Sequence, residues 1–328
     1  MVKNIWKKDK FAFILLAIFI LLPLIFRGNA DLQNTLIYIL IYAIVGEGWN
    51  LISGFTGQTS FGHAAYFGIG AYTAAVLGNK YDVTPWLGML AGVLLAGALA
   101  FILNYKLFTL KGHYFAIATM AVCEIMKVLF SVWMYVGSGD GIKIKARMTN
   151  RFYWMALNVR NRLPFFFITL ALFVIVFIAC RLLEESRYGF YWKAIRESHE
   201  AAESIGVNPQ MYKSAAMVFS AMIAAVGGTL YAQFFKFIDP NIFSLDISMI
   251  FVLVTVLGGI GSCYGPIIGS IIYYALDLLM RRLMGGSTSG INLIIFGILL
   301  VAVVCYQPRG IVGIIQDIRH KAAVNKEV

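Results

Sequence analysis

Ionisable residues inside the apolar stretches of the sequence are the ones that could do chemistry in a membrane. Glu47, Glu124 and Lys127 lie in such stretches. At the centre of a span each costs about 2.5 to 3.5 kcal/mol, so each needs a partner or a water-filled cavity. We expect Glu124 and Lys127 to pair on one helix. Glu47 precedes a glycine-rich segment and is expected to face a cavity, but one carboxylate is poor support for a proton relay.

Motifs for enzyme chemistry are missing from the sequence. It has no HExxH, GxSxG or paired-carboxylate motif, and its glycine cluster at residues 258–269 lacks the GK[ST] ending of a P-loop. We therefore expect no enzyme, no metal and no cofactor. The cysteines lie in apolar segments without CxxC spacing, which predicts reduced packing residues; they are Cys123, Cys180, Cys263 and Cys305.

Glycines and small polar residues crowd residues 49–72, which read WNLISGFTGQTSFGHAAYFGIGAY. Such a cluster permits a break in a helix at membrane depth, where the backbone can line a water-filled path. The alternative is that the glycines only allow close helix packing, and that the histidine is a buried, satisfied one. The predicted translocation pathway comprises Glu47, Gly57, Gln58, Ser60, Gly62, His63, Gly68 and Gly70.

The densest run of charge is residues 181–213, with five basic and five acidic residues. It cannot lie in hydrocarbon, so it must be in water between two apolar blocks. A helical spacing of apolar and small residues within it predicts one short amphipathic helix, ended by Gly206 and by the Asn208–Pro209 pair. The stripe consists of Tyr191, Ile195, Ser198, Ala202 and Ile205. A short helix displayed in water favours docking to another protein.

The composition is that of an all-α polytopic membrane protein. Hydrophobic residues make up 60% of the chain, charged residues 13%, and mean hydropathy is +0.79. We expect about ten membrane segments, including broken or half-length helices, with 247–257 too short to cross alone. They are 11–26, 32–52, 61–77, 85–103, 114–135, 164–182, 215–237, 247–257, 267–283 and 291–306.

An even number of spans places both termini on one side, and the positive-inside rule makes that side cytoplasmic. The net charge of +11 then reflects topology and lipid headgroups rather than nucleic acid. The basic loop 137–163 falls outside, where it could meet acidic residues of a soluble binding protein or lipid phosphates. Residues 311–328 predict an amphipathic cytoplasmic tail. We expect no soluble catalytic domain at either end, so energy must come from another polypeptide.

Three motif regions carry a family resemblance. Glu200-Ala201-Ala202 followed by Gly206 fits E-A-A-x-x-x-G, and residues 50–72 fit N-L-x-x-G-x-x-G-x-x-S-x-G-H followed by G-x-G-A-Y. With the glycine cluster at 258–269, these residues resemble the branched-chain amino acid permeases of ATP-binding-cassette (ABC) importers, the M-type more than the H-type. Gln307 departs from the R-P-R-G that usually closes the family pattern.

The resemblance implies an ABC importer permease fold, with one transmembrane domain over 1–310 in a bacterial-type inner membrane. It implies a second, similar permease subunit, two ATPase subunits that dock on the loop 184–213, and an extracytoplasmic binding protein selecting leucine, isoleucine or valine. The implied ATPase-coupling residues are Arg196, Glu197, Glu200, Ala201, Ala202 and Gly206. Urea or short amides are alternative substrates, and a proton- or sodium-coupled secondary transporter is an alternative class.

Overall fold

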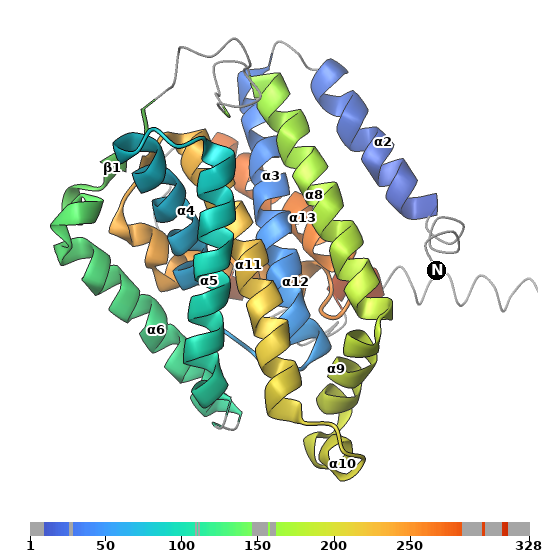
Figure 1. Cartoon of the computed structure of the whole chain (residues 1–328). Helices are drawn as coiled ribbons and strands as arrows, with labels where there is room; N and C mark the ends of the chain where they lie inside the picture. Colours follow the sequence, from blue (N-terminus) through green and yellow to red (C-terminus); the bar gives the residue numbers. More distant parts are fainter. Residues whose placement is uncertain are drawn as a thin grey trace, which may run out of the picture.

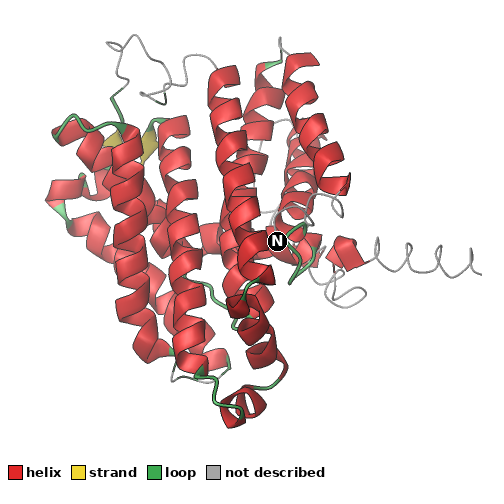
Figure 2. Ribbon diagram, turned by 45° about the vertical axis from the view of Figure 1, so that its right-hand side comes forward, coloured by secondary structure: helices red, strands yellow, loops and turns green. Residues whose placement is uncertain are grey.

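The computed structural model describes residues 10–25, 29–108, 110, 112–145, 157, 162–283, 297–298 and 310–313. Long helices run side by side through these residues and form a bundle (Figures 1 and 2). They are α2 (Lys10–Ile25), α3 (Ala30–Trp49), α4 (His63–Lys80), α5 (Pro85–Leu107), α6 (His113–Val132), α8 (Arg162–Glu185), α11 (Pro209–Phe235), α12 (Leu245–Gly258) and α13 (Gly265–Leu283).

Shorter elements connect the long helices. They are the π-helix η1 (Asn50–Phe55), the 3-10 helices η2 (Met134–Val136), η3 (Ser138–Asp140) and η4 (Pro240–Phe243), the helices α9 (Arg187–Glu197) and α10 (His199–Ser204), and the strands β1 (Ile142–Lys143) and β2 (Phe237–Ile238).

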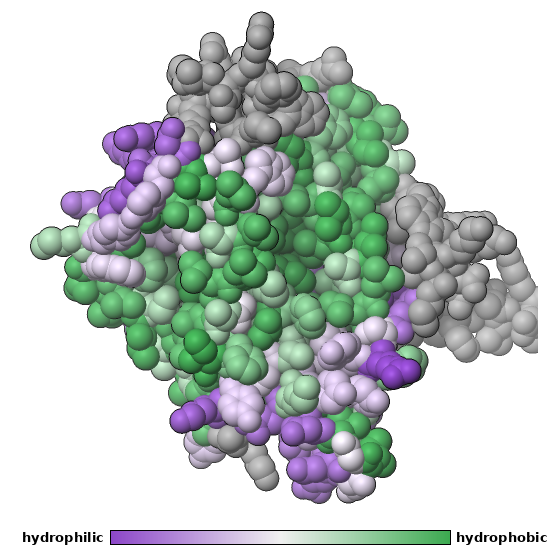
Figure 3. Space-filling view, in the orientation of Figure 1, coloured by the Kyte–Doolittle hydropathy of each residue, from purple (hydrophilic) through white to green (hydrophobic). Residues whose placement is uncertain are grey.

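Nine of the ten predicted spans correspond to helices in the described part of the chain, and of the tenth, 291–306, only residues 297–298 are described. Within the described residues, five helical segments are long and apolar enough to cross a membrane: Ala30–Phe55, Pro85–Leu107, His113–Val132, Arg162–Glu185 and Pro209–Phe235. The prediction of an all-α polytopic membrane protein is confirmed. In Figure 3 hydrophobic surface covers the middle of the visible face, and polar residues gather toward its two ends.

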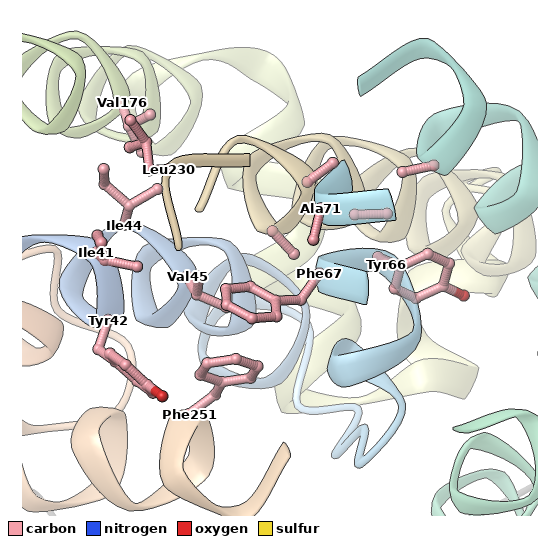
Figure 4. Packing of buried hydrophobic residues seen from close by; sticks show 14 of the residues in the cluster. Ile41, Tyr42, Ile44, Val45, Tyr66, Phe67, Ala71, Val176, Leu230 and Phe251 are labelled. Atoms are coloured by element: carbon pink, nitrogen blue, oxygen red, sulfur yellow. The ribbon is translucent and has the colours of Figure 1, made fainter. Parts of the chain in front are cut away.

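Helix α11 is the centre of the bundle and packs against α3, α4 and α5. Small residues make these crossings close: a Cβ on Gly70 would meet the backbone of Ala225, and one on Gly228 would meet the carbonyl oxygen of Phe67. Larger side chains fill the space between α3, α4 and α12, where the rings of Phe67 and Phe251 lie 5.2 Å apart (Figure 4). Close packing of this kind fixes the depth of the break that follows α3.

Helices α12 and α13 form a tight hairpin. The fourteen residues of α12 rise about 21 Å, which is less than the ~30 Å of a hydrocarbon core. A Cβ on Gly269 would meet the carbonyl oxygen of Val254, so the two helices touch through their backbones. The glycine cluster at 258–269 therefore serves helix packing, and the predicted half-length helix is present.

Residues 137–145 of the basic loop and the loop 184–213 lie at opposite ends of the bundle (Figure 1). At one end, β1 of the basic loop pairs antiparallel with β2, with Ile142 opposite Ile238. Asn79, near the end of α4, holds this loop by donating to the carbonyl oxygen of Lys143 (2.8 Å). At the other end, α9 and α10 project below the membrane helices. This arrangement agrees with the prediction that the two loops lie on opposite sides of the membrane segments.

Candidate functional site

The helix break predicted in the glycine-rich segment is present. Helix α3 widens into the π-helix Asn50–Phe55, the chain leaves helical structure at residues 56–62, and α4 begins at His63. A π-turn inside an α-helix is rare and frequently marks a functional site. The freed backbone is partly satisfied locally, because Thr56 Oγ1 donates to the carbonyl oxygen of Ile52 (2.6 Å). This irregular segment is the first part of the candidate site.

Asn50 connects the π-helix to the turn between α12 and α13. Its Nδ2 donates to the carbonyl oxygen of Ser262 (3.0 Å), and its Oδ1 accepts from the amide of Gly261 (2.8 Å). The side chain is fully buried. Because both ends of the amide bind the same turn, the two backbone irregularities are held as one unit.

Arg196, on the last turn of α9, joins this unit from below. Its Nη1 donates to the carbonyl oxygen of Gly54 in the π-helix (2.6 Å). Gly57 and Gly261 both have positive φ, and a Cβ on them would lie 3.2 Å from Arg196 Cγ and 2.7 Å from Arg196 Nη1, respectively. The absence of side chains at these glycines makes room for the arginine. A predicted coupling residue therefore touches the predicted pathway segment.

The predicted single amphipathic helix is wrong, because the chain forms two helices there. Ser198 is extended (φ −156°, ψ 117°) and ends α9, and its Oγ accepts from the amide of Ala201 (3.2 Å) to cap α10. Serine is a strong N-cap residue and competes with helix continuation. The predicted stripe is broken as a result, and Ile205 is 75% exposed.

The remaining predicted coupling residues are placed on or beside α10. Glu197 ends α9 and is exposed, as are Glu200 and Ala201. Ala202 is buried in a small cluster with Ile195 and Val207. Gly206 adopts φ +84°, which ends the helix as predicted, and a Cβ there would have open space around it. A buried anchor thus holds an otherwise exposed short helix.

Gln58 and Ser60 are buried in the break, whereas Gly57 and Thr59 are exposed. Gln58 Oε1 accepts from Lys213 Nζ (3.1 Å), so α11 also contacts the segment. The carbonyl oxygen of Ser60 accepts from Trp49 Nε1 (2.7 Å). These contacts fix the loop between η1 and α4 to the helices on both sides of it.

His63 is fully buried at the start of α4. Ser220 Oγ donates to the carbonyl oxygen of Gly48 (2.5 Å) and lies 2.6 Å from His63 Nε2. A hydroxyl has one proton, so Nε2 must be the donor to Ser220, and Nδ1 is an acceptor with no partner among the residues that the structure describes. Through Ser220, His63 connects α4 to α11 and to α3, which is the packing of a buried core histidine.

Three predicted pathway glycines lie at close contacts. A Cβ on Gly62 would be 2.9 Å from the carbonyl oxygen of Thr119, one on Gly68 would meet the ring of Phe243, and Gly70 touches α11. This geometry fits the close-packing alternative. Their part in a translocation path stays a prediction.

The three ionisable residues of the apolar stretches differ in burial. Glu47 is 1% exposed, and neither carboxylate oxygen has a hydrogen-bond partner among the described residues. The expected pair of Glu124 and Lys127 is wrong: among the described residues these two form no ion pair with each other, and Glu124 is exposed on α6. The ion pairs of the described residues cluster instead at the α8–α9 junction, where Glu184 binds Arg181 (2.8 Å) and Lys193 (3.0 Å).

Comparison with known proteins shows the family of the chain. The family described as "Branched-chain amino acid transport system / permease component" matches residues 32–304. The chain belongs to this family. The permease is 28% identical over 327 residues to the high-affinity branched-chain amino acid transport system permease protein LivM of Escherichia coli K12, covering 93% of this chain and 75% of LivM.

Two further relatives have the same type of name. LivH of Escherichia coli K12 is 26% identical over 286 residues, covering 83% of this chain and 91% of LivH. BraD of Pseudomonas aeruginosa is 23% identical over 305 residues, covering 89% of this chain and 98% of BraD. The greater coverage by LivM agrees with the M-type resemblance. No solved structure matches the chain significantly.

Some residues that organise the site of the permease were not among the predicted ones. Asn50 stands in the N-L-x-x-G pattern, which gives its position but not its bond to a turn more than two hundred residues away. Trp192 is fully buried, and its Nε1 donates to the carbonyl oxygen of Tyr212 (2.9 Å), fixing α9 against α11. A tryptophan in a charge-rich loop was the available signal for that anchor.

Proposed function

We propose that the permease is the membrane subunit of an ATP-driven importer of branched-chain amino acids, and that α9 and α10 receive the movement of a separate ATPase. The hydrogen bond from Arg196 Nη1 to the carbonyl oxygen of Gly54 carries the proposal. It joins a helix pair outside the bundle to the break in a membrane helix. A displacement of α9 therefore acts directly on the backbone of η1.

The surface of α10 suits docking. Glu200 and Ala201 are exposed, Ile205 adds apolar area, and Ala202 anchors the helix from beneath. Trp192 and the hydrogen bond to Tyr212 hold α9 in turn to α11. Because α10 and α9 are anchored in this way, a displacement of α10 by the ATPase moves α9 with it.

The proposed topology follows from the ATPase. ATPase subunits are in the cytoplasm, so the loop of the permease on which they dock, 184–213, is cytoplasmic. The basic loop 137–163 is then extracytoplasmic, and both termini are cytoplasmic in an inner membrane. The opposite positions of α9–α10 and of the β1–β2 pair support this assignment. Residues 1–310 are one transmembrane domain; the proposed tail, 311–328, lies outside the described residues beyond residue 313.

The proposed partners are a second, similar permease subunit, two ATPase subunits, an extracytoplasmic binding protein and membrane lipids. The names of the relatives support leucine, isoleucine and valine as substrates. The path runs past the break, where Gly57 and Thr59 are exposed and Glu47 is a buried carboxylate without a hydrogen-bond partner in the described part of the chain.

The proposal is tested by reversing charge on α10. With Glu200→Lys we expect the ATPase that co-purifies with the permease to fall at least fivefold, with loss of leucine uptake into proteoliposomes. Asp140→Lys reverses an exposed acid at the other end of the bundle and is the control, in which ATPase co-purification stays at the wild-type level. Equal ATPase binding in both variants would refute the docking assignment.

Uptake by the wild-type complex tests substrate and energy source. We expect leucine uptake to require the ATPase and ATP, and unlabelled urea not to compete with it. Uptake by the permease alone, driven by a proton or sodium gradient, would establish the secondary-transporter alternative. Competition by urea would establish the other substrate class.

A further inference from the structure

Helix α6 has an exposed face that differs from the exposed face of α5. Ile117, Ile125, Val128 and Val132 are between 55% and 67% exposed and follow a helical spacing. Within this stripe Glu124 is also exposed, and Lys127 is partly exposed. Among the described elements, the inner face of α6 packs mainly against η3, η4, α4 and α12.

The position of Glu124 is the informative feature. Tyr114 and Trp133 mark the two ends of the helix as aromatic residues do at membrane interfaces. Glu124 lies about 14 to 15 Å along the axis from each of them, near the middle of the span. A carboxylate facing lipid tails at that depth is costly, so such residues nearly always face protein or water.

The exposed face of α5 provides the comparison. It presents Leu87, Leu90, Leu94 and Ile102, between 56% and 68% exposed, and the only charged residue of α5 is Lys106 near its end. This face suits lipid. The α6 stripe, which is similarly apolar but contains a carboxylate and an ammonium one turn apart, suits lipid poorly.

We propose that the α6 stripe is the surface that binds the second permease subunit. Glu124 and Lys127 make no ion pair with each other, so an adjacent helix that offers a donor and an acceptor one turn apart would match both charges. Polar contacts of this type hold membrane helices together and set their register, while the flanking isoleucines and valines supply packing. The inference rests on the proposed function in taking a similar subunit as the partner.

Photo-crosslinking in membranes that contain the whole transporter tests the surface. The photoreactive residue p-benzoylphenylalanine replaces Ile125 on α6 or, as the matched control, Leu94 on α5; the two native side chains are 64% and 57% exposed. We expect at least fivefold more product with the tagged second subunit from position 125. Equal yields, product within one chain, or product only between two copies of this chain would overturn the proposal.

A second measurement tests the role of the charge. We expect Glu124→Ala to reduce the second subunit that co-purifies severalfold, Glu124→Gln to restore part of it, and Leu94→Ala to have no effect. No change in Glu124→Ala would remove the carboxylate from the interface. ATP-dependent uptake, measured in the same membranes, distinguishes the failures: uptake without a crosslink overturns only the surface, and a crosslink without such uptake overturns only the proposed function.

Discussion

Replacing Arg196 by alanine tests how α9 controls the helix break. The change removes the hydrogen bond to Gly54 and leaves a carbonyl of the π-helix without its partner. Hydrogen bonds to charged groups contribute about 1.5 to 3 kcal/mol. Arg196 is largely exposed, so water can replace it and the lower value applies. A loss of about 1.5 kcal/mol changes the ratio of joined to separated states roughly tenfold.

The assay is the number of ATP molecules hydrolysed per leucine imported by the complex in proteoliposomes. We expect Arg196→Ala to raise this ratio about tenfold, because α9 then moves without moving η1. Arg196→Lys keeps a donor and should lie between the two. Arg187→Ala removes an exposed arginine from the other end of α9 and serves as the control. A ratio in Arg196→Ala equal to that of Arg187→Ala would refute the reasoning.

Two further predictions concern folding. In Gly70→Val the new side chain meets the backbone of Ala225, so we expect the free energy of unfolding to fall by about 1 to 3 kcal/mol and the melting temperature to drop. Gly78→Ala is the control, because a Cβ has room there and should cost no stability. Equal melting temperatures in the two variants would exclude a packing role for Gly70. Burial lowers the pKa of Lys236, which follows α11, to about 8. The unfolded state therefore binds more protons between pH 8 and the normal lysine value, and stability should rise with pH in that window. Lys236→Met should lose this rise, and an unchanged pH dependence of unfolding would contradict the assignment.

Much of the membrane architecture could be predicted from the sequence, because local properties determine it. Apolar length predicted nine segments that are helices in the described part of the chain, five of them long enough to cross a membrane, and the glycine cluster before His63 predicted the break after α3. Gly206 ends a helix because a left-handed conformation at that position is a backbone property, readable from the residue type.

Other features depend on contacts that no local pattern shows. The apolar stripe through Ser198 indicated one helix, but the serine hydroxyl capped a second helix and turned the chain. Spacing brought Glu124 and Lys127 together on one helix, yet it could not show which surroundings each side chain has. The bonds from Asn50 to Gly261 and from Arg196 to Gly54 join residues far apart in sequence, so only the fold reveals them.

The π-helix at Asn50–Phe55 has a mechanical consequence. Its wide turn holds one residue more than regular helix needs. If α3 took up that surplus, everything after it would rotate by about 100° and shift by about 1.5 Å along the axis. The extra residue lies in the π-helix, whose Gly54 carbonyl oxygen accepts a hydrogen bond from Arg196. A small displacement of Arg196 that removed the extra residue from the turn would therefore rotate the residues after it by a large angle.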